Sequence, residues 1–195
     1  MRVPQLVLAA LLLLPPACGA FLGGGHAAAG VRDARRRAVD GAVRLPAVQC
    51  GARIRIVSVG KSSRDEPWVI TAIGEYTKRL RSTIELELVW VKDDTALQAQ
   101  LSRAEEPCII LDERGSVATS VELGERLFAG LEEGGNRLSF FIGGADGLPA
   151  PLKADRSKLL SLSRLTFPHQ VARLLLVEQI YRAAEIRKGS GYHKD

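Results

Sequence analysis

Residues 138–148 read LSFFIGGADGL, and this stretch decides the fold. Its first five residues form an apolar run interrupted only by Ser139, which is typical of a strand buried on both faces. The run continues directly into a glycine loop that contains Gly143 and Gly144. Glycine at a strand end lets backbone groups approach a ligand closely, and open α/β sheets bind ligands at that edge. By itself the G-G-x-x-G pattern is weak evidence, because it matches neither the dinucleotide fingerprint nor a phosphate-binding loop.

Strand and helix patterns alternate on both sides of this stretch. Alternating β-branched residues predict a strand at 54–60, and apolar residues three or four positions apart predict a helix at 66–81. The other expected elements are strands at 83–91 and 108–111, helices at 95–104, 120–132 and about 150–157, a short stretch at 158–162, and a long helix opened by Pro168. We expect Ser120 to cap the helix at 120–132. The alternation predicts an α/β fold, with a mostly parallel sheet and helices on both faces.

Residues 1–53 differ in composition from the rest of the chain. Residues 1–20 contain a nine-residue apolar run followed by Pro15, Pro16 and small residues, which predicts a cleavable signal peptide. Residues 21–53 are rich in arginine and poor in acidic residues, as in a transit peptide. Together the two segments resemble the bipartite presequences of algae with secondary plastids. We therefore expect import into a plastid, with mitochondrial import and plain secretion as alternatives, and no stable membrane association after the leader is removed.

The formal net charge of +5 belongs to the leader. Residues 1–53 hold 7 arginines and 2 aspartates, whereas residues 54–195 hold 20 basic and 20 acidic residues. A neutral domain has no general attraction to nucleic acid, so any RNA contact requires a local basic patch or a composite surface such as a dimer provides. Cys18, Cys50 and Cys108 show no C-x-x-C spacing, so we expect neither a disulfide framework nor a metal site.

A second stretch, residues 160–183, reads LSLSRLTFPHQVARLLLVEQIYRA. Together with the glycine loop and the final residues 191–195, GYHKD, it resembles the SPOUT family of trefoil-knotted methyltransferases. Within that family it is similar to the enzymes that methylate N3 of a pseudouridine in large-subunit ribosomal RNA. The resemblance covers residues 54–195. It implies a C-terminal trefoil knot, S-adenosyl-L-methionine as the cofactor, a homodimer, and ribosomal RNA as the partner. The neutral charge of the domain favours recognition of that RNA within an assembled ribosome over free RNA.

The resemblance also implies which residues form the site. Catalytic candidates are His169 and Arg173 at the start of the last helix, and Tyr192 and His193 in the tail. Methyl transfer to an imide nitrogen needs a group that takes its proton, and a histidine or tyrosine suits that role. Cofactor contacts are expected from the ends of three strands: Leu111, Gly143, Gly144, Leu162, Ser163, Arg164, Leu165, Thr166, Phe167 and Pro168.

Several alternatives stay open at this point. Glu178 and Arg182 lie four residues apart and are explained equally well by pairing with each other or by a catalytic role. The broad apolar face of the last helix is expected either in the core or in a dimer seam. A non-catalytic knotted factor that binds RNA or assists ribosome assembly is the first alternative function, and a knotted methyltransferase acting on transfer RNA is the second. The intact glycine loop and the Tyr192-His193 tail favour catalysis.

Overall fold

The computed structural model describes residues 51–60, 66–144, 148 and 150–194. The expected signal peptide, nearly all of the transit-peptide-like segment, and residues 145–147 of the glycine loop lie outside the described residues. Among the residues described, no helix has the length and apolar character required to cross a membrane. The fold presented below belongs to the compact unit formed by residues 45–195.

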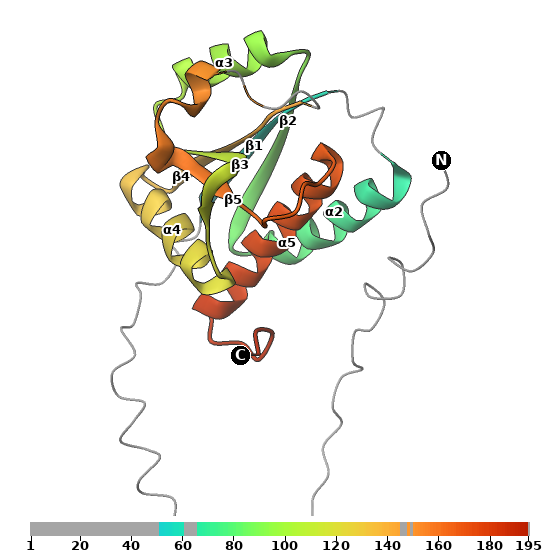
Figure 1. Cartoon of the computed structure of the whole chain (residues 1–195). Coiled ribbons are helices and arrows are strands. Elements are labelled where there is room, and N and C mark those ends of the chain that lie inside the picture. The colour runs from blue at the N-terminus through green and yellow to red at the C-terminus, as the bar shows by residue number, and fades with distance from the viewer. Residues whose placement is uncertain (1–50, 61–65, 145–147, 149, 195) are drawn as a thin grey trace, which may run out of the picture. The chain divides into compact units, whose positions relative to one another are not determined.

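A five-stranded parallel sheet forms the centre of this unit (Figure 1). The strands are β1 (Ala52–Val59), β2 (Ile84–Val91), β3 (Cys108–Val117), β4 (Arg137–Ile142) and β5 (Leu159–Ser161), in the order β2-β1-β4-β3-β5. The parallel pairing confirms the sheet expected from the alternation of strands and helices. The direction of winding reverses between β1 and β4, and the crevice outside the carboxyl ends of such a pair of strands is the usual ligand site of an open α/β sheet.

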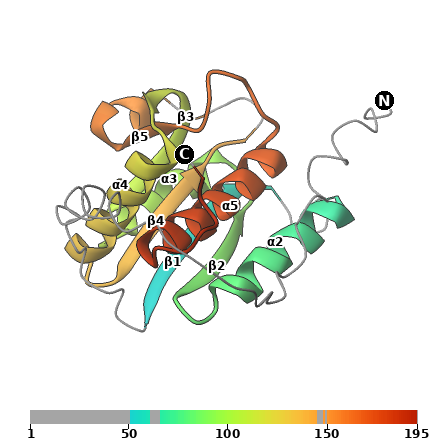
Figure 2. The same ribbon diagram turned by 90° about the horizontal axis from the view of Figure 1, so that it is seen from below.

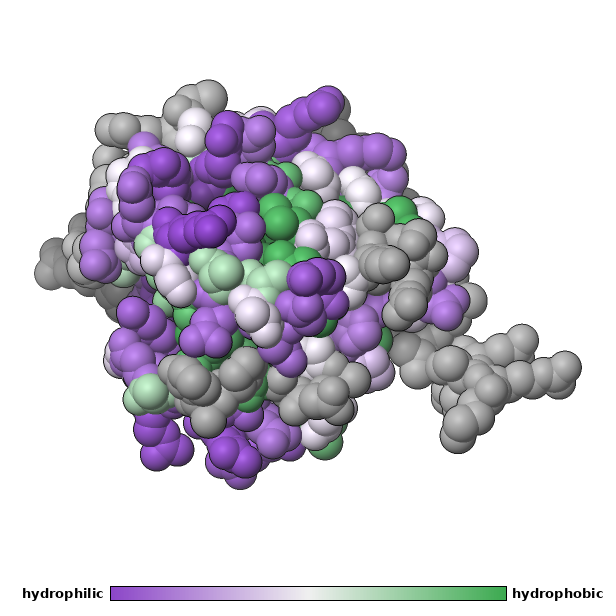
Figure 3. All heavy atoms as spheres, turned by 90° about the horizontal axis from the view of Figure 1, so that it is seen from above, coloured by the Kyte–Doolittle hydropathy of each residue, from purple (hydrophilic) through white to green (hydrophobic). Residues whose placement is uncertain are grey.

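Helices cover both faces of the sheet, as expected. On one face, α2 (Pro67–Leu80), α4 (Ser120–Glu133) and α5 (His169–Arg187) share one hydrophobic core, and α5 lies between the other two (Figures 1 and 2). On the other face, α3 (Asp94–Arg103) joins a smaller core through Leu97. The side of the molecule that carries α3 is covered largely by hydrophilic side chains, with a small hydrophobic group near its centre (Figure 3). The α/β layering is thus confirmed, whereas the trefoil knot stays a prediction.

The broad apolar face of α5 belongs to the core of its own chain. Leu174, Val177 and Ile180 are at most 5% exposed and pack in the cluster shared with α2 and α4. Burying side chains of this size contributes about 1.5–3 kcal/mol each to folding. These three residues therefore pack within the chain, whereas Val171, Leu175 and Tyr181 of the same helix are only half-buried.

Three local predictions were wrong. The helix expected at 150–157 is replaced by two 3-10 turns, η3 (Ala150–Lys153) and η4 (Arg156–Lys158). The Asp155 carboxylate accepts a hydrogen bond from the backbone N–H of Ser157, and such local bonds compete with a continuous helix. Thr119, not Ser120, caps α4, because Thr119 and Glu122 form a reciprocal capping box. Pro168 precedes α5 as its N-cap and is not its first residue.

Strand β3 extends beyond the expected segment 108–111 and contains an irregularity. Its pairing with β5 shifts register between Leu111 and Ser116, since both of these residues pair with Leu160. The intervening residues bulge out, and Asp112 closes the bulge by accepting a hydrogen bond from the backbone N–H of Arg114 at 2.9 Å. Gly115 then passes so close to β5 that a Cβ on it would lie 2.6 Å from backbone atoms of Leu160. This close crossing positions the segment that follows β5.

Candidate cofactor and substrate site

A cavity of about 680 Å³ lies at the carboxyl end of β4 and beside the bulge in the middle of β3. It is bounded by the strand ends, by the bulge of β3 and by the start of α5. Its volume falls within the ~300–1,000 Å³ typical of sites for small ligands and cofactors. The lining residues are Leu111, Asp112, Glu113, Arg114, Ile142, Gly143, Gly144, Leu148, Lys153, Thr166, Phe167, Pro168, His169 and Ala172.

The ends of β1 and β4 meet the start of α5 at this cavity. A Cβ on Gly144 would lie 3.3 Å from Cγ1 of Val59, so the glycine loop passes close to the end of β1 and a larger residue would press on the Val59 side chain. Gly60 has a φ of +133°, a conformation that favours glycine, and the position of its absent Cβ is 3.9 Å from Nε2 of His169. Gly143 and Gly144 therefore occupy the place expected for them, and His169 stands beside them.

An ion pair in the wall of the cavity was missed by the sequence reasoning. The Asp112 carboxylate lies 3.4 Å from Nζ of Lys153, and its side chain is only 5% exposed. Asp112 directly follows a fully apolar strand in the sequence, which was a usable signal for a carboxylate at the sheet edge. Lys153 had no such signal, because it is brought here by the turn η3.

The segment between β5 and α5 contributes only in part to this cavity. Thr166, Phe167 and Pro168 line it, whereas Leu162 lines a smaller neighbouring cavity. The expected contacts Ser163, Arg164 and Leu165 line neither cavity. Ser163 instead shapes the turn, because its hydroxyl accepts a hydrogen bond from the Leu165 N–H at 3.0 Å and its carbonyl accepts one from the Ser161 hydroxyl. Arg164 and Leu165 are exposed.

His169 and Arg173 have different surroundings although they are four residues apart on α5. His169 lines the cavity. Arg173 is 1% exposed, does not line the cavity, and its guanidinium lies 5.4 Å from the ring centroid of Trp90 in β2. The structure therefore places His169 at the cavity and buries Arg173 next to Trp90.

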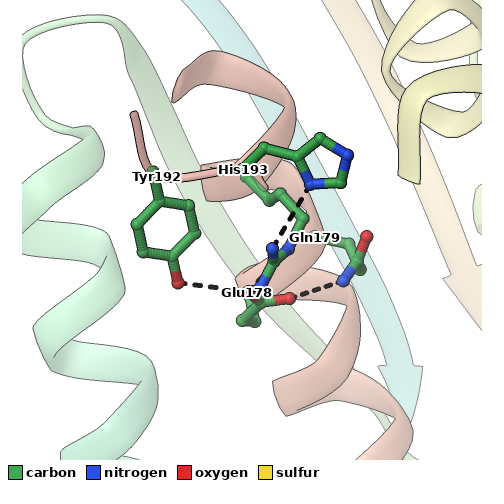
Figure 4. Close-up of polar contacts among 5 residues, drawn as sticks. Glu178, Gln179, Tyr192 and His193 are labelled. Carbon is green, nitrogen blue, oxygen red and sulfur yellow. Dashed lines mark hydrogen bonds and ion pairs between the residues drawn. The ribbon is translucent and has the colours of Figure 1, made fainter. Parts of the chain in front are cut away.

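The C-terminal tail folds back onto α5 and ends in a polar cluster around Glu178 (Figure 4). The Glu178 carboxylate accepts hydrogen bonds from Arg182 Nη2 at 2.6 Å, from Gln179 Nε2 at 2.6 Å and from the Tyr192 hydroxyl at 3.2 Å. Nδ1 of His193 lies 3.5 Å from Nη1 of Arg182. Glu178 and Arg182 pair with each other, which is one of the two interpretations left open by the sequence. The pair also anchors the tail.

Aromatic rings hold the tail from the other side. The ring of Tyr192 meets that of Tyr181 edge to face at 5.0 Å, and Tyr181 lies 5.6 Å from Tyr76 of α2. Burial, together with the negative charge of Glu178, raises the pKa of the Tyr192 phenol above its usual value. Burial alone would lower the pKa of Arg182, but its hydrogen bond to Glu178 raises it. Tyr192 is thus a neutral hydrogen-bond donor at physiological pH, not a base.

Backbone hydrogen bonds at the end of α5 turn the chain back. The N–H of Gly189 donates to the carbonyl of Ile186, and the N–H of Ser190 donates to that of Glu185. These two bonds form a Schellman motif, and Gly189 supplies the left-handed residue it requires, with a φ of +67°. Glu178 lies nine residues after His169, about 13 Å along the helix axis at ~1.5 Å per residue. Within one chain, therefore, the tail candidates and His169 form two separate groups.

The comparison with known proteins decides to which protein family the chain belongs. Residues 52–193 match the family model described as Predicted SPOUT methyltransferase, which covers most of the chain. The chain belongs to the SPOUT methyltransferase family. The resemblance inferred from residues 54–195 is confirmed, and so is methyltransferase as the class of enzyme.

Curated relatives of this SPOUT methyltransferase carry the name Ribosomal RNA large subunit methyltransferase H. That of Protochlamydia amoebophila (strain UWE25) is 46% identical over 142 residues, covering 73% of this chain and 99% of the relative. That of Synechococcus sp. (strain CC9605) is 47% identical over 147 residues, covering 73% and 97%. A solved structure from Bacillus anthracis superposes with a TM-score of 0.43 at 13% identity over 72% of this chain and 99% of its own, which is too distant to bear on the site.

This SPOUT methyltransferase has another cleft, of about 630 Å³, at the opposite edge of the sheet, where β3 and β4 begin. Cys108 and Glu106 lie in it. Burial, helped by the charge of Glu106, raises the pKa of the Cys108 thiol to about 11. A thiol with a pKa raised in this way is protonated at neutral pH, so Cys108 is not an activated nucleophile.

Proposed function

We propose that this chain transfers the methyl group of S-adenosyl-L-methionine to N3 of a pseudouridine in large-subunit ribosomal RNA of an organelle. The observation that carries the proposal is the cavity beside the end of β4 and the bulge of β3, which the glycine loop and the segment before α5 enclose. The names of the relatives support the class of substrate, since they specify methylation of large-subunit ribosomal RNA. The pseudouridine and its N3 atom rest on the motif resemblance in residues 160–195.

The residues of the cavity fit the cofactor. The backbone at Gly143 and Gly144 is free of side chains, and a Cβ on Gly144 would already be in tight contact with Val59. Apolar side chains offer walls for an adenine ring, while Asp112 and Lys153 offer an acceptor and a donor for the polar groups of the ligand. Bound S-adenosyl-L-methionine supplies a methyl group already activated by its sulfonium, so the protein's contribution is mainly positioning.

The imide proton of the substrate needs an acceptor. Tyr192 is unsuited to that role, because its raised pKa keeps the phenol protonated. His169 lines the cofactor cavity, and His193 lies in the tail. We assign proton removal to one of these two histidines and assign Tyr192 to holding the tail.

We propose a homodimer that joins the two groups of candidates. Within one chain the tail docks on α5 at a distance from His169, so we propose that the tail of one subunit completes the cavity of its partner. The exposed apolar residues Val117, Val121 and Leu165, which are 40–70% exposed, offer a seam at the ends of β3, α4 and β5. Burial of apolar residues such as these is what a stable interface requires.

RNA recognition requires a local surface, because the domain has no net charge. Near the tail the guanidinium of Arg79 lies 5.8 Å and 5.9 Å from the ring centroids of Tyr76 and Tyr181. Exposed arginine next to aromatic rings suits contact with phosphates and unstacked bases. Such a small patch favours an assembled ribosome as the substrate, since free RNA is usually captured by a larger basic surface.

Residues 1–53 are proposed to direct the chain to a plastid, on their composition alone. A fluorescent fusion of residues 1–53 should accumulate in the plastid. Accumulation in mitochondria would support the first alternative, and export from the cell would support plain secretion.

Nucleoside mass spectrometry tests the proposed function. Ribosomes from cells lacking this protein should have lost 3-methylpseudouridine from the large-subunit RNA, and purified protein with labelled S-adenosyl-L-methionine should restore it. Unchanged ribosomal modification together with loss of a methylated nucleoside from transfer RNA would favour the transfer RNA enzyme. Unchanged modification with defective ribosome assembly would favour the non-catalytic factor.

A further inference from the structure

A smaller cavity of about 260 Å³ adjoins the cofactor cavity. Phe167 lines both, so the two cavities are neighbours. The smaller one is enclosed by the end of β5, the start of α4 and the middle of α5, with Leu162, Leu175 and Gln179 among its lining residues. Leu162 and Phe167 are also expected cofactor contacts, whereas Leu175 and Gln179 have no role assigned above.

A single stripe of α5 connects the two cavities with the tail. Ala172 lines the cofactor cavity, Leu175 and Gln179 line the smaller one, and Arg182 contacts the tail. The spacings of three and four residues put these side chains on one face of the helix. The smaller cavity is therefore situated between the cofactor site and the tail residues.

The size and lining of this cavity suit one pyrimidine base. Its volume is well under half that of the cofactor cavity. Phe167, Leu162 and Leu175 present apolar surface for the faces of a ring, whereas Gln179 presents an amide. A planar heterocycle with a polar edge matches that combination of surfaces.

The orientation of the Gln179 amide is fixed by its neighbour. Its Nε2 donates to the Glu178 carboxylate at 2.6 Å, and a carboxylate only accepts hydrogen bonds. The amide nitrogen must therefore face Glu178, so the carbonyl oxygen Oε1 faces another direction. Among the described residues no donor to Oε1 is recorded, which leaves this atom as an acceptor for a ligand.

We propose that the smaller cavity binds the target base and that Oε1 of Gln179 accepts a hydrogen bond from N1–H of pseudouridine. This inference rests on the proposed function. When N3 of the base points towards the methyl donor, N1, which C2 separates from N3, lies on an adjacent edge of the ring and can face Gln179. Uridine has a carbon at that position and offers no donor. Gln179 is thus the residue that selects pseudouridine over uridine, because a polar group left unpaired in a closed site strongly disfavours binding.

The test compares two substrates and matched variants of the full chain. Ribosomes carrying the pseudouridine are compared with ribosomes from cells lacking the corresponding pseudouridine synthase, which carry uridine. The variant Gln179→Met keeps the length of the side chain but removes the acceptor, and Gln179→Leu is a second variant of the same kind. Gln98→Leu, at an exposed position of α3 on the other face of the sheet, is the control.

The wild-type protein and the control should methylate pseudouridine in clear preference to uridine. Gln179→Met should lower kcat/KM on pseudouridine about 10-fold to 100-fold more than kcat/KM on uridine, the effect of one lost hydrogen bond that only pseudouridine makes. Calorimetric titration with S-adenosyl-L-methionine should give wild-type affinity, which shows that the variant is folded. Unchanged preference for pseudouridine in both Gln179 variants would overturn the inference alone. A wild-type protein that makes 3-methylpseudouridine on neither substrate would overturn the proposed function and the inference with it.

Discussion

Substituting Gly115 by alanine should destabilise the domain at the point where β3 crosses β5. A Cβ at this position would lie 2.6 Å from the N and C atoms of Leu160 and 2.8 Å from the C atom of Leu159. Ordinary contact begins at 3.4 Å, so β5 would have to move by about 0.8 Å. The atoms in the way belong to the backbone, and no change of rotamer removes the clash.

The magnitude follows from the bonds that hold β5 in place. The carbonyl of Leu159 accepts hydrogen bonds from the Ser116 hydroxyl at 3.3 Å and from Arg126 Nη1 at 3.2 Å, and β5 also pairs with β3. Each such bond contributes about 0.5–1.5 kcal/mol net. Loss of two or three of them predicts a decrease in the free energy of unfolding of about 2–4 kcal/mol. Cofactor affinity should fall too, because the segment that follows β5 forms one wall of the cavity.

Urea unfolding of residues 51–195, followed by circular dichroism, measures the effect. The matched control is Gly74→Ala, in the middle of α2, where a Cβ meets nothing within 4 Å. Alanine should stabilise that helix by up to about 1 kcal/mol, so the two substitutions are expected to have opposite signs. A Gly115→Ala protein as stable as wild type would refute the close crossing of β3 and β5.

Three further predictions concern the site and its surroundings. Gly144→Val should weaken binding of S-adenosyl-L-methionine at least 10-fold in calorimetry, because the new side chain enters the cavity. The thermal midpoint should change less, because the side chain presses on a single neighbouring side chain. Wild-type affinity would mean that the loop is only a turn. Removing residues 192–195 should eliminate methyl transfer. Cofactor affinity and dimerisation, the latter measured by sedimentation, should stay nearly unchanged, because α5 is complete without these residues. Full activity on ribosomes would show that the tail plays no part in catalysis. Cys108 is the sole cysteine of residues 51–195, and burial raises its pKa to about 11. At pH 8 it should therefore react with iodoacetamide roughly 100-fold more slowly than a thiol with the ordinary pKa of 9.0. A reaction rate that levels off near pH 9 would contradict the burial of this thiol.

The sequence by itself determined the class of fold and the family, and it placed the glycine loop at the edge of the sheet where the cavity lies. Apolar runs such as 138–142 are buried on both faces wherever they occur in a parallel sheet, so they can be recognised without knowing their neighbours. The glycine loop follows such a strand directly, and the carboxyl ends of parallel strands share one edge, which placed Gly143 and Gly144 correctly. These features depend on residues that are close together along the chain.

Only the tertiary structure decided which side chains meet. Arg173 has the spacing of a site residue but lies buried over Trp90, a residue 83 positions earlier in the chain. Lys153 reaches Asp112 because two short turns replace an expected helix. The tail reaches Glu178 because Gly189 reverses the chain at the end of α5. The physical reason is the same in each case. These contacts join elements whose distance in space is set by the packing of helices on the sheet, and no local spacing in the sequence records that distance in space.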